Sequence, residues 1–304
     1  MDILSLRHVS KSFGSLDVIR DLNLTVREHA VYGLIGKNGA GKTTTMKMVL
    51  GFLKATAGEI TVCGEKVVYG QSKTNRHIGY LPDVPEFYGF MRPMEYLTLC
   101  GEISGMTPSD IKRRAGELLE CVGLGTVNRK IGGFSRGMKQ RLGIAQALLG
   151  APKLLICDEP TSALDPVGRK ELLDILQGVR SETAIIFSTH ILADVERVCD
   201  DIGILDGGRL VLSGRLSEVK NTYRSDCVFI EPAKKESAGQ LAEKLALLPD
   251  VKSAAAAENG VIAQLQSGGD ARAILSALVS ANLAIVKFEV REPSLEDVFL
   301  EVIQ

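Results

Sequence analysis

The chain of 304 residues is long enough for about two domains, and its apolar content of 45% supplies a buried core for each. Its formal net charge of −1 lacks the positive excess of a dedicated nucleic-acid-binding protein, so we expect no nucleic-acid partner. Its six cysteines form no C-x-x-C pair, which favours free thiols in a reducing cytoplasm over a zinc or disulfide framework.

The first elements in chain order predict a small antiparallel unit around one buried strand. Apolar residues alternate with polar ones over 22–26 and over 60–62, which is the period of half-buried strands. Between them, the apolar run 30–35 predicts a short buried strand, and 42–50 predicts the helix that follows it. A strand, a tight loop and a helix in this order are the usual setting of a phosphate-binding loop.

The loop between this strand and helix, residues 36–43, fits G-x-x-x-x-G-K-[ST], whose backbone N–H groups surround nucleotide phosphates. Its glycines let the backbone fold around an anion, and the helix N-terminus directs the positive end of its dipole there. A chance Gly-rich turn is the alternative, but it would not explain the flanking strand and helix. We expect Lys42 to reach the β- and γ-phosphates and Thr43 to ligate Mg²⁺. The predicted nucleotide-binding residues are Gly36, Asn38, Gly39, Ala40, Gly41, Lys42, Thr43 and Thr44.

The middle of the chain predicts a helical segment followed by parallel strands. Residues 84–150 have a largely helical pattern interrupted by glycine and proline. The continuous apolar runs 154–157 and 184–187 are typical of strands buried on both faces of a parallel sheet. A helix is expected between them, with Asp165 at its N-cap and Pro166 at its first position.

Two adjacent carboxylates, Asp158 and Glu159, end the first of these two strands. The C-terminal edge of a parallel strand is where ligands bind in α/β sheets. We therefore expect Asp158 to help hold Mg²⁺ and Glu159 to polarise an attacking water as general base. Solvated acids at a strand end are the alternative, which the nearby phosphate loop disfavours.

The last part of the chain predicts a separate small domain. A Gly-rich hairpin signal at 206–208 is followed by an expected domain boundary at residues 220–221. From there the pattern is β-α-β-β-α-β with a terminal helix, which predicts a ferredoxin-like domain. The apolar run 273–286 is too short and too interrupted by polar residues to span a bilayer. The acidic start Met1-Asp2-Ile3 is unlike a secretory signal, so any membrane role should come through a partner.

Taken together, these motifs resemble the ATP-binding cassette (ABC) ATPases over about residues 1–215. The resemblance rests on the phosphate loop, the run 158–162, Asp165 and the triplet 188–190, which occur in the family's order. It implies an α/β fold with a P-loop NTPase (RecA-like) core, an antiparallel β-subdomain and a helical subdomain.

The domain limits that follow from this resemblance divide the chain in two. An ABC ATP-binding domain is expected over 1–220, with its helical subdomain at about 84–150. The remaining residues, 221–304, are expected to form the small α+β ferredoxin-like domain, an accessory domain whose residues show no catalytic constellation.

The run 134–140, Phe-Ser-Arg-Gly-Met-Lys-Gln, is similar to the family's signature, more usually L-S-G-G-Q. Ser135 is a good N-cap residue for the helix expected here. Arg136 and Lys139 crowd the first turns of that helix, where the dipole disfavours cations unless an anion docks. The resemblance implies that Ser135 and Gly137 contact the γ-phosphate of ATP held by an opposing subunit. A basic, solvent-exposed helix start is the alternative.

Three further roles follow from the resemblance alone. Phe13 matches the aromatic residue that stacks on adenine, although a core residue at a strand end is also open. His190 matches the family histidine that contacts the γ-phosphate, although a histidine in this setting is more often structural. Asp165 matches the aspartate that couples the two sites across the dimer.

One position departs from the family pattern. Asp83 stands where the family usually has a glutamine that touches Mg²⁺ and the attacking water. A carboxylate can ligate Mg²⁺ but cannot donate a hydrogen bond. Three features resemble the drug- and antibiotic-exporting branch of the family. They are the acid at this position, the Arg136 and Met138 variants of the signature, and the terminal run 292–300, which is similar to that branch's C-terminal extension.

The sequence therefore predicts the ATPase subunit of an ABC-2-type exporter. Two such subunits would enclose two Mg-ATP head to tail and drive a separate integral-membrane permease, to which the cytoplasmic chain would be attached at the inner face of the membrane. An ABC importer ATPase and a non-transport ABC ATPase acting on a soluble assembly are alternatives. A P-loop GTPase is disfavoured because no N-K-x-D guanine-binding element follows the phosphate loop.

Overall fold

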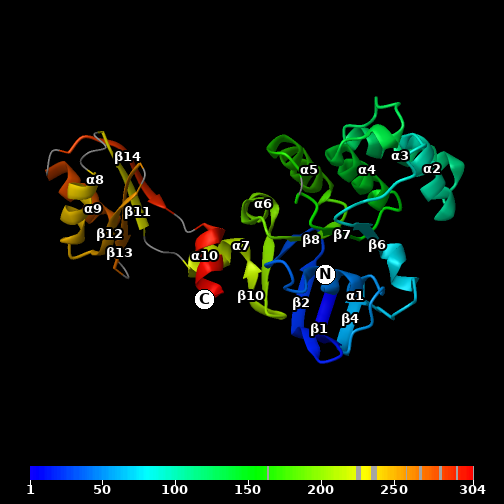
Figure 1. The fold of residues 1–304 in the computed structure, drawn as a ribbon, viewed down its shortest axis with the longest axis horizontal. Coiled ribbons are helices and arrows are strands. Elements are labelled where there is room, and N and C mark those ends of the chain that lie inside the picture. Colours follow the sequence, from blue (N-terminus) through cyan, green and yellow to red (C-terminus); the bar gives the residue numbers. More distant parts are fainter. Residues whose placement is uncertain are drawn as a thin grey trace. The chain divides into compact units, whose positions relative to one another are not determined.

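The computed structural model describes residues 1–162, 164–223, 227–233, 238–257, 259–266, 269–280, 283–291 and 294–303. It divides into two compact units, Met1–Leu216 and Ser217–Val302 (Figure 1). The sequence predicts a domain boundary a few residues later, at 220–221. Glu292 and Pro293, which open the terminal run that resembles the exporter branch, lie outside the described residues.

The first unit contains an antiparallel sheet of four strands in the order β2-β1-β4-β5. Its alternation of apolar and polar residues is the one that the sequence predicts, because Leu22, Leu24 and Val26 are buried while their neighbours face outward. The strands are β1 (Asp2–Phe13), β2 (Leu16–Arg27), β4 (Ala57–Val62) and β5 (Glu65–Lys66).

A second sheet of the same unit has six strands in the order β10-β9-β3-β8-β7-β6. All neighbouring pairs are parallel except the hairpin of β9 and β10. The central strands β3, β7 and β8 are buried along their whole length, as their continuous apolar runs predict. The strands are β3 (Val31–Ile35), β6 (Ile78–Leu81), β7 (Leu154–Asp158), β8 (Ala184–Thr189), β9 (Asp201–Asp206) and β10 (Arg209–Arg215).

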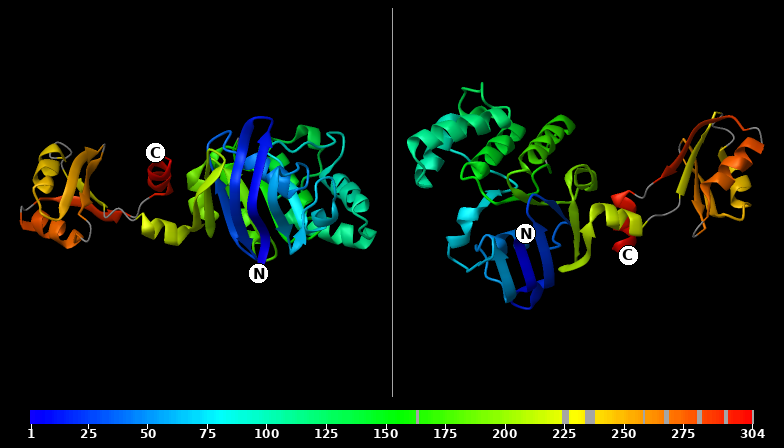
Figure 2. Two further views of the ribbon diagram at one scale, coloured as in Figure 1. Left: turned by 90° about the horizontal axis from the view of Figure 1, so that it is seen from below. Right: turned by 180° about the vertical axis from the view of Figure 1, so that it is seen from behind.

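Helices cover the parallel sheet, and α2 to α5 gather on the side away from the antiparallel sheet (Figures 1 and 2). The helical pattern predicted from residue 84 begins later, at Pro93, where proline occupies the first helical position and the Glu95 carboxylate accepts a hydrogen bond from the Arg92 N–H. The helices of this unit are α1 (Lys42–Val49), α2 (Pro93–Ile103), α3 (Pro108–Cys121), α4 (Arg136–Leu148), α5 (Pro166–Val179) and α6 (Leu192–Val198), with 3₁₀ turns at Lys73–His77 and Ile131–Gly133.

One hydrophobic core joins the two sheets of the first unit. It contains Leu4 and Leu22 from the antiparallel sheet, Met46 from α1, and Leu34 and Ile186 from the parallel sheet. All five side chains are at most 1% exposed. Because α1 packs in this shared core, the loop that precedes it is held by both sheets.

The second unit is a four-stranded antiparallel sheet in the order β12-β13-β11-β14, with its own hydrophobic core. Its helices and strands follow one another as β-α-β-β-α-β with a final helix, and this is the ferredoxin-like arrangement that the sequence predicts. No helix among the described residues is long and apolar enough to cross a membrane. The elements are α7 (Leu216–Thr222), β11 (Cys227–Pro232), α8 (Ala238–Ala246), β12 (Val251–Ala257), β13 (Gly260–Leu265), α9 (Ala271–Ser280), β14 (Ile285–Arg291) and α10 (Leu295–Val302).

Candidate nucleotide site

The Gly-rich loop lies between the end of β3 and the start of α1. Gly39 and Gly41 have φ values of 85° and 108°, a region that side-chain-bearing residues rarely adopt. A Cβ on Gly41 would also overlap the Ile19 side chain, and one on Gly36 would lie 2.6 Å from the Leu205 carbonyl oxygen. The loop is therefore closely packed against Ile19 and Leu205, while its Gly39 and Gly41 line the cavity at the start of α1.

Lys42 turns back across this loop. Its side chain is 5% exposed, and its Nζ donates hydrogen bonds to the carbonyl oxygens of Gly36 at 2.7 Å and Lys37 at 3.2 Å. The same ammonium lies 3.0 Å from Glu159 Oε1. A buried cation of this kind is stabilised by its hydrogen-bonded carbonyl groups and by the facing carboxylate. The ammonium thus lies against the loop backbone and lines the cavity beside it.

Asp158 ends β7, Glu159 follows it, and both are held by the neighbouring strand β8. Ser188 Oγ donates a 2.6 Å hydrogen bond to Asp158 Oδ1 and accepts one of 3.0 Å from the Glu159 N–H. Glu159 has a φ of 47°, which is uncommon for a residue other than glycine and is typical of strained functional positions. Its Oε2 lies 2.9 Å from His190 Nδ1. The edge of the sheet thus brings these carboxylates and His190 to the same place.

A cavity of about 350 Å³ joins these groups to the phosphate loop. Most of the predicted loop residues line it, together with Asp83, Glu159 and His190. Val18 and Ser162 also line it, although sequence reasoning gave them no role. The described lining is Val18, Asn38, Gly39, Gly41, Lys42, Thr43, Thr44, Asp83, Glu159, Ser162 and His190.

Several other predicted site residues lie outside the described lining of this cavity. Phe13 is at the exposed end of β1, with the Lys11 ammonium 4.6 Å from its ring centre. Asp165 is exposed and caps α5 by accepting a hydrogen bond from the Gly168 N–H. Gly36, Ala40, Asp158, Ser135 and Gly137 are also outside the lining.

The signature run begins α4, as the sequence predicts. Ser135 is the N-cap residue, and its Oγ accepts a 3.2 Å hydrogen bond from the Met138 N–H. Ser135 is exposed, and a Cβ on Gly137 would meet its nearest neighbour, Leu164, only at 3.7 Å. The start of this helix is therefore open to a ligand or partner that approaches from outside.

Asp83 connects this helix to the cavity. Its Oδ1 accepts a hydrogen bond of 3.1 Å from Ser162 Oγ and lies 3.4 Å from Arg136 Nη2. Gln140 Nε2 donates a 2.6 Å hydrogen bond to the Asp83 carbonyl oxygen. Burial raises the pKa of the nearby Tyr80 to about 12, and the carboxylates of Asp158 and Asp83 add to this shift.

The residues that follow Glu159 are also held by a buried contact. Thr161 Oγ1 donates a 2.6 Å hydrogen bond to Asp194 Oδ2 in α6. Burial raises the pKa of Asp194, while Thr161 and the Arg169 guanidinium oppose that shift. The contact joins the segment after β7 to the segment after β8, so the relative position of Glu159 and His190 is fixed on both sides.

Comparisons with known proteins agree with this geometry. A family model described as "ABC transporter" matches residues 19–162, and another, described as "ATP-binding protein DrrA1-3-like, C-terminal domain", matches residues 214–303. The chain is similar to "Uncharacterized ABC transporter ATP-binding protein YxlF" of Bacillus subtilis, with 40% identity over 99% of both chains. It belongs to the ABC transporter ATP-binding proteins. It is therefore an ABC ATPase that binds ATP.

This ABC protein is also similar to a transport ATP-binding protein and to a solved structure of an ATP-binding subunit. It is 35% identical to "Bacitracin transport ATP-binding protein BcrA" of Bacillus licheniformis, over 99% of this chain and 97% of that one. A solved structure titled "Structure of ATP binding subunit of ABC transporter" matches with 32% identity and a TM-score of 0.66. That match covers 73% of this chain and 93% of the solved one. The predicted RecA-like fold class is thus confirmed.

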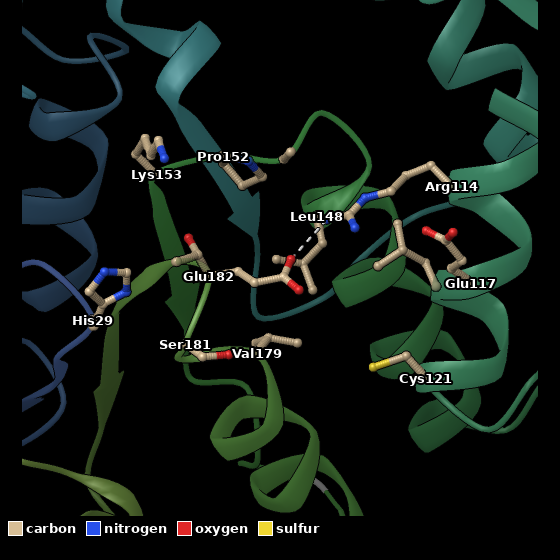
Figure 3. A pocket seen from close by; sticks show the side chains of 13 residues that line it. His29, Arg114, Glu117, Cys121, Leu148, Pro152, Lys153, Val179, Ser181 and Glu182 are labelled. Carbon is tan, nitrogen blue, oxygen red and sulfur yellow. Dashed lines mark ion pairs between the residues drawn. The ribbon is translucent and has the colours of Figure 1, made fainter. Parts of the chain in front are cut away.

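A larger cavity of this ABC protein, of about 540 Å³, is separate from the nucleotide site (Figure 3). His29, Lys153 and Thr183 line it, and each comes just before one of the strands β3, β7 and β8. It therefore lies at the opposite edge of the parallel sheet from the phosphate loop. Its charged side chains partly neutralise each other, with Arg114 Nη2 lying 3.5 Å from Glu182 Oε2.

Proposed function

We propose that this ABC ATPase hydrolyses Mg-ATP as one of two subunits that associate head to tail, and that hydrolysis drives export through a separate membrane permease. The observation that carries the proposal is the convergence of Lys42, Glu159 and His190 at one cavity. Contacts of 3.0 Å and 2.9 Å join the Glu159 carboxylate to the other two side chains.

The donors around this cavity fit Mg²⁺. Asp158 and the hydroxyl of Thr43 are hard oxygen ligands, and Asp83 is a third candidate. Among the described residues, no group of three His, Cys, Asp or Glu side chains could hold a metal ion alone. P-loop proteins bind Mg²⁺ with few side chains, the substrate phosphates and water. Bound Mg²⁺ would neutralise the negative charge that develops on the transferred phosphoryl group.

Each of the three side chains at this cavity would have its own role in the reaction. Lys42 binds the β- and γ-phosphates. Glu159 accepts a proton from the attacking water, and the 2.9 Å contact with His190 orients its carboxylate. His190 also contacts the γ-phosphate. Water positioning and phosphate binding therefore depend on the same pair of side chains.

The proposed association of two subunits is supported by predicted site residues that do not line the cavity. Ser135 and Asp165 are exposed, Phe13 is 48% exposed, and none of the three lines the described cavity. Ser135 and Gly137 would complete the ATP site of a second subunit, Asp165 would couple the two sites, and Phe13 would stack on adenine. The second subunit is an identical copy or a paralogue.

The proposed direction of transport rests on family evidence. The DrrA-like C-terminal match and the similarity to the bacitracin transport protein favour an exporter of a drug or antibiotic over an importer. The membrane-crossing path would belong to the permease, with this chain at the cytoplasmic face of the membrane.

Co-purification of the Glu159→Gln variant tests this function. The tagged variant is extracted from its native membranes with mild detergent in the presence of Mg-ATP, and the proteins bound to it are identified. We expect a polytopic membrane protein at a fixed stoichiometry, because ATP should hold the paired subunits closed when hydrolysis is blocked.

The Lys42→Ala variant is the matched control, since it should not hold ATP and should not form the closed pair. A ribosomal or other soluble partner in place of the membrane protein would contradict the transport function. It would leave the ATPase assignment intact.

A further inference from the structure

We propose that Arg136 is a positioning residue that holds the Asp83 carboxylate at the edge of the nucleotide cavity. Through this contact, Asp83 would link the start of α4 to the catalytic sheet within one subunit. The inference deepens the proposed function and rests on it, because Asp83 lines the proposed ATP site.

The Asp83 carboxylate is held from two sides. Ser162 Oγ, in the segment after β7, donates a 3.1 Å hydrogen bond to Oδ1, and Arg136 Nη2 of α4 lies 3.4 Å from the same oxygen. These two partners come from different layers of the unit, the sheet edge and the helical group. A displacement of α4 relative to β7 must therefore break one of the two contacts or move the carboxylate.

The backbone of Asp83 is fixed independently of its side chain. Gln140, which is 1% exposed, donates a 2.6 Å hydrogen bond from Nε2 to the Asp83 carbonyl oxygen. Because Gln140 and Arg136 lie one turn apart on α4, one helix face holds both the backbone and the carboxylate of Asp83. With the backbone fixed, the direction of the carboxylate depends on Ser162 and Arg136.

The charge of Arg136 supports this role. A cation in the first turn of a helix is disfavoured by the helix dipole unless an anion compensates for it. Asp83 is that anion for Arg136. Lys139 lies on the same helix, and within the described part of the chain no ion pair joins it to Asp83. The contact with Asp83 therefore distinguishes Arg136 from its basic neighbour.

Hydrogen exchange on the nucleotide-free protein directly tests the contact between Arg136 and Asp83. We compare the wild type with Arg136→Gln, Arg136→Lys and the control Lys139→Gln over residues 84–92, the segment that follows Asp83. Arg136→Gln should speed exchange there by about threefold to fivefold, the size that a partly exposed ion pair supports. Arg136→Lys should restore most of the protection, and Lys139→Gln should leave it unchanged.

Steady-state ATP hydrolysis gives the second readout, in a double-mutant cycle with Asp83→Asn. Alone, Arg136→Gln should lower kcat by about threefold to fivefold with little change in KM for ATP. In the Asp83→Asn background it should have no further effect, because Arg136 acts through that carboxylate. Lys139→Gln should have the same effect in both backgrounds.

Two results would overturn the inference: unchanged exchange over 84–92 in Arg136→Gln, or an equal effect of Arg136→Gln on kcat in both backgrounds. The latter would mean that Arg136 acts elsewhere, for example on the phosphates of an opposing subunit. A wild-type protein without ATPase activity would instead contradict the proposed function. The exchange experiment would still decide whether Arg136 holds Asp83.

Discussion

At the scale of single residues, the Lys42–Glu159 ion pair has a consequence for nucleotide binding. The ammonium lies 3.0 Å from the carboxylate and is 5% exposed, so Glu159 competes with phosphate for the same cation. The proposed general base therefore also acts on the affinity for ATP.

The Glu159→Gln substitution should separate these two effects. Turnover should fall by about 10²-fold or more because the general base is lost. Affinity for ATP should be kept or increased, since a neutral amide competes less for Lys42. Binding of a fluorescent ATP analogue and phosphate release measure the two quantities, and retained hydrolysis would remove Glu159 from the base role.

Lys42→Ala is the complementary variant, because it removes the phosphate-binding ammonium and leaves the base in place. It should weaken ATP binding itself by at least about tenfold, the loss expected when a charge-assisted contact to phosphate is removed. An unchanged affinity in the same binding assay would contradict the role of Lys42.

At the scale of elements, the close approach of α4 to β6 positions Asp83. A Cβ on Gly79 of β6 would overlap the Ala147 carbonyl oxygen in α4, and it would lie 3.0 Å from the Pro152 ring. Only glycine permits this separation of helix and strand. The same helix carries Gln140 and the same strand leads into Asp83, so their 2.6 Å hydrogen bond depends on it.

Gly79→Ala should therefore destabilise the first unit by about 1–3 kcal/mol through overpacking, and it should weaken the hold of α4 on Asp83. Denaturant unfolding measures the loss of free energy. Gly178→Ala is the matched control, because a Cβ at this exposed position in α5 meets nothing within 4 Å. That change should raise stability by up to about 1 kcal/mol through helix propensity. Equal stability of the two variants would show that α4 can shift freely on β6.

At the scale of the whole molecule, each compact unit contains a hydrophobic core of its own among the described residues. Every predicted nucleotide-site residue lies within the first unit, Met1–Leu216. The described lining residues of the nucleotide cavity also belong to that unit. The site should therefore not need the second unit for its assembly.

A chain that ends at Leu216 should fold and bind ATP within about twofold of the full chain, since the first unit contains a hydrophobic core and all the predicted site residues. The full chain should show two unfolding transitions in calorimetry and the shortened chain one. Loss of nucleotide binding on truncation would show that the second unit supports the fold of the first.

The sequence by itself determined the features that depend on neighbouring residues. The phosphate loop, the buried strands that end at Asp158 and just before His190, and the N-caps at Ser135 and Asp165 all follow from short-range patterns of polarity, glycine and proline. The β-α-β-β-α-β order of the second unit follows from the same periodicities.

Only the tertiary structure decided the contacts between distant segments. The sequence gives no sign that Arg136 and Gln140 contact Asp83, which lies more than fifty positions earlier. It also gives no sign that Ser162 donates a hydrogen bond to the Asp83 carboxylate. It also does not reveal that Glu159 lies between Lys42 and His190. Local periodicity fixes which face of an element is buried, whereas the packing of helices on the sheet fixes which polar side chains meet.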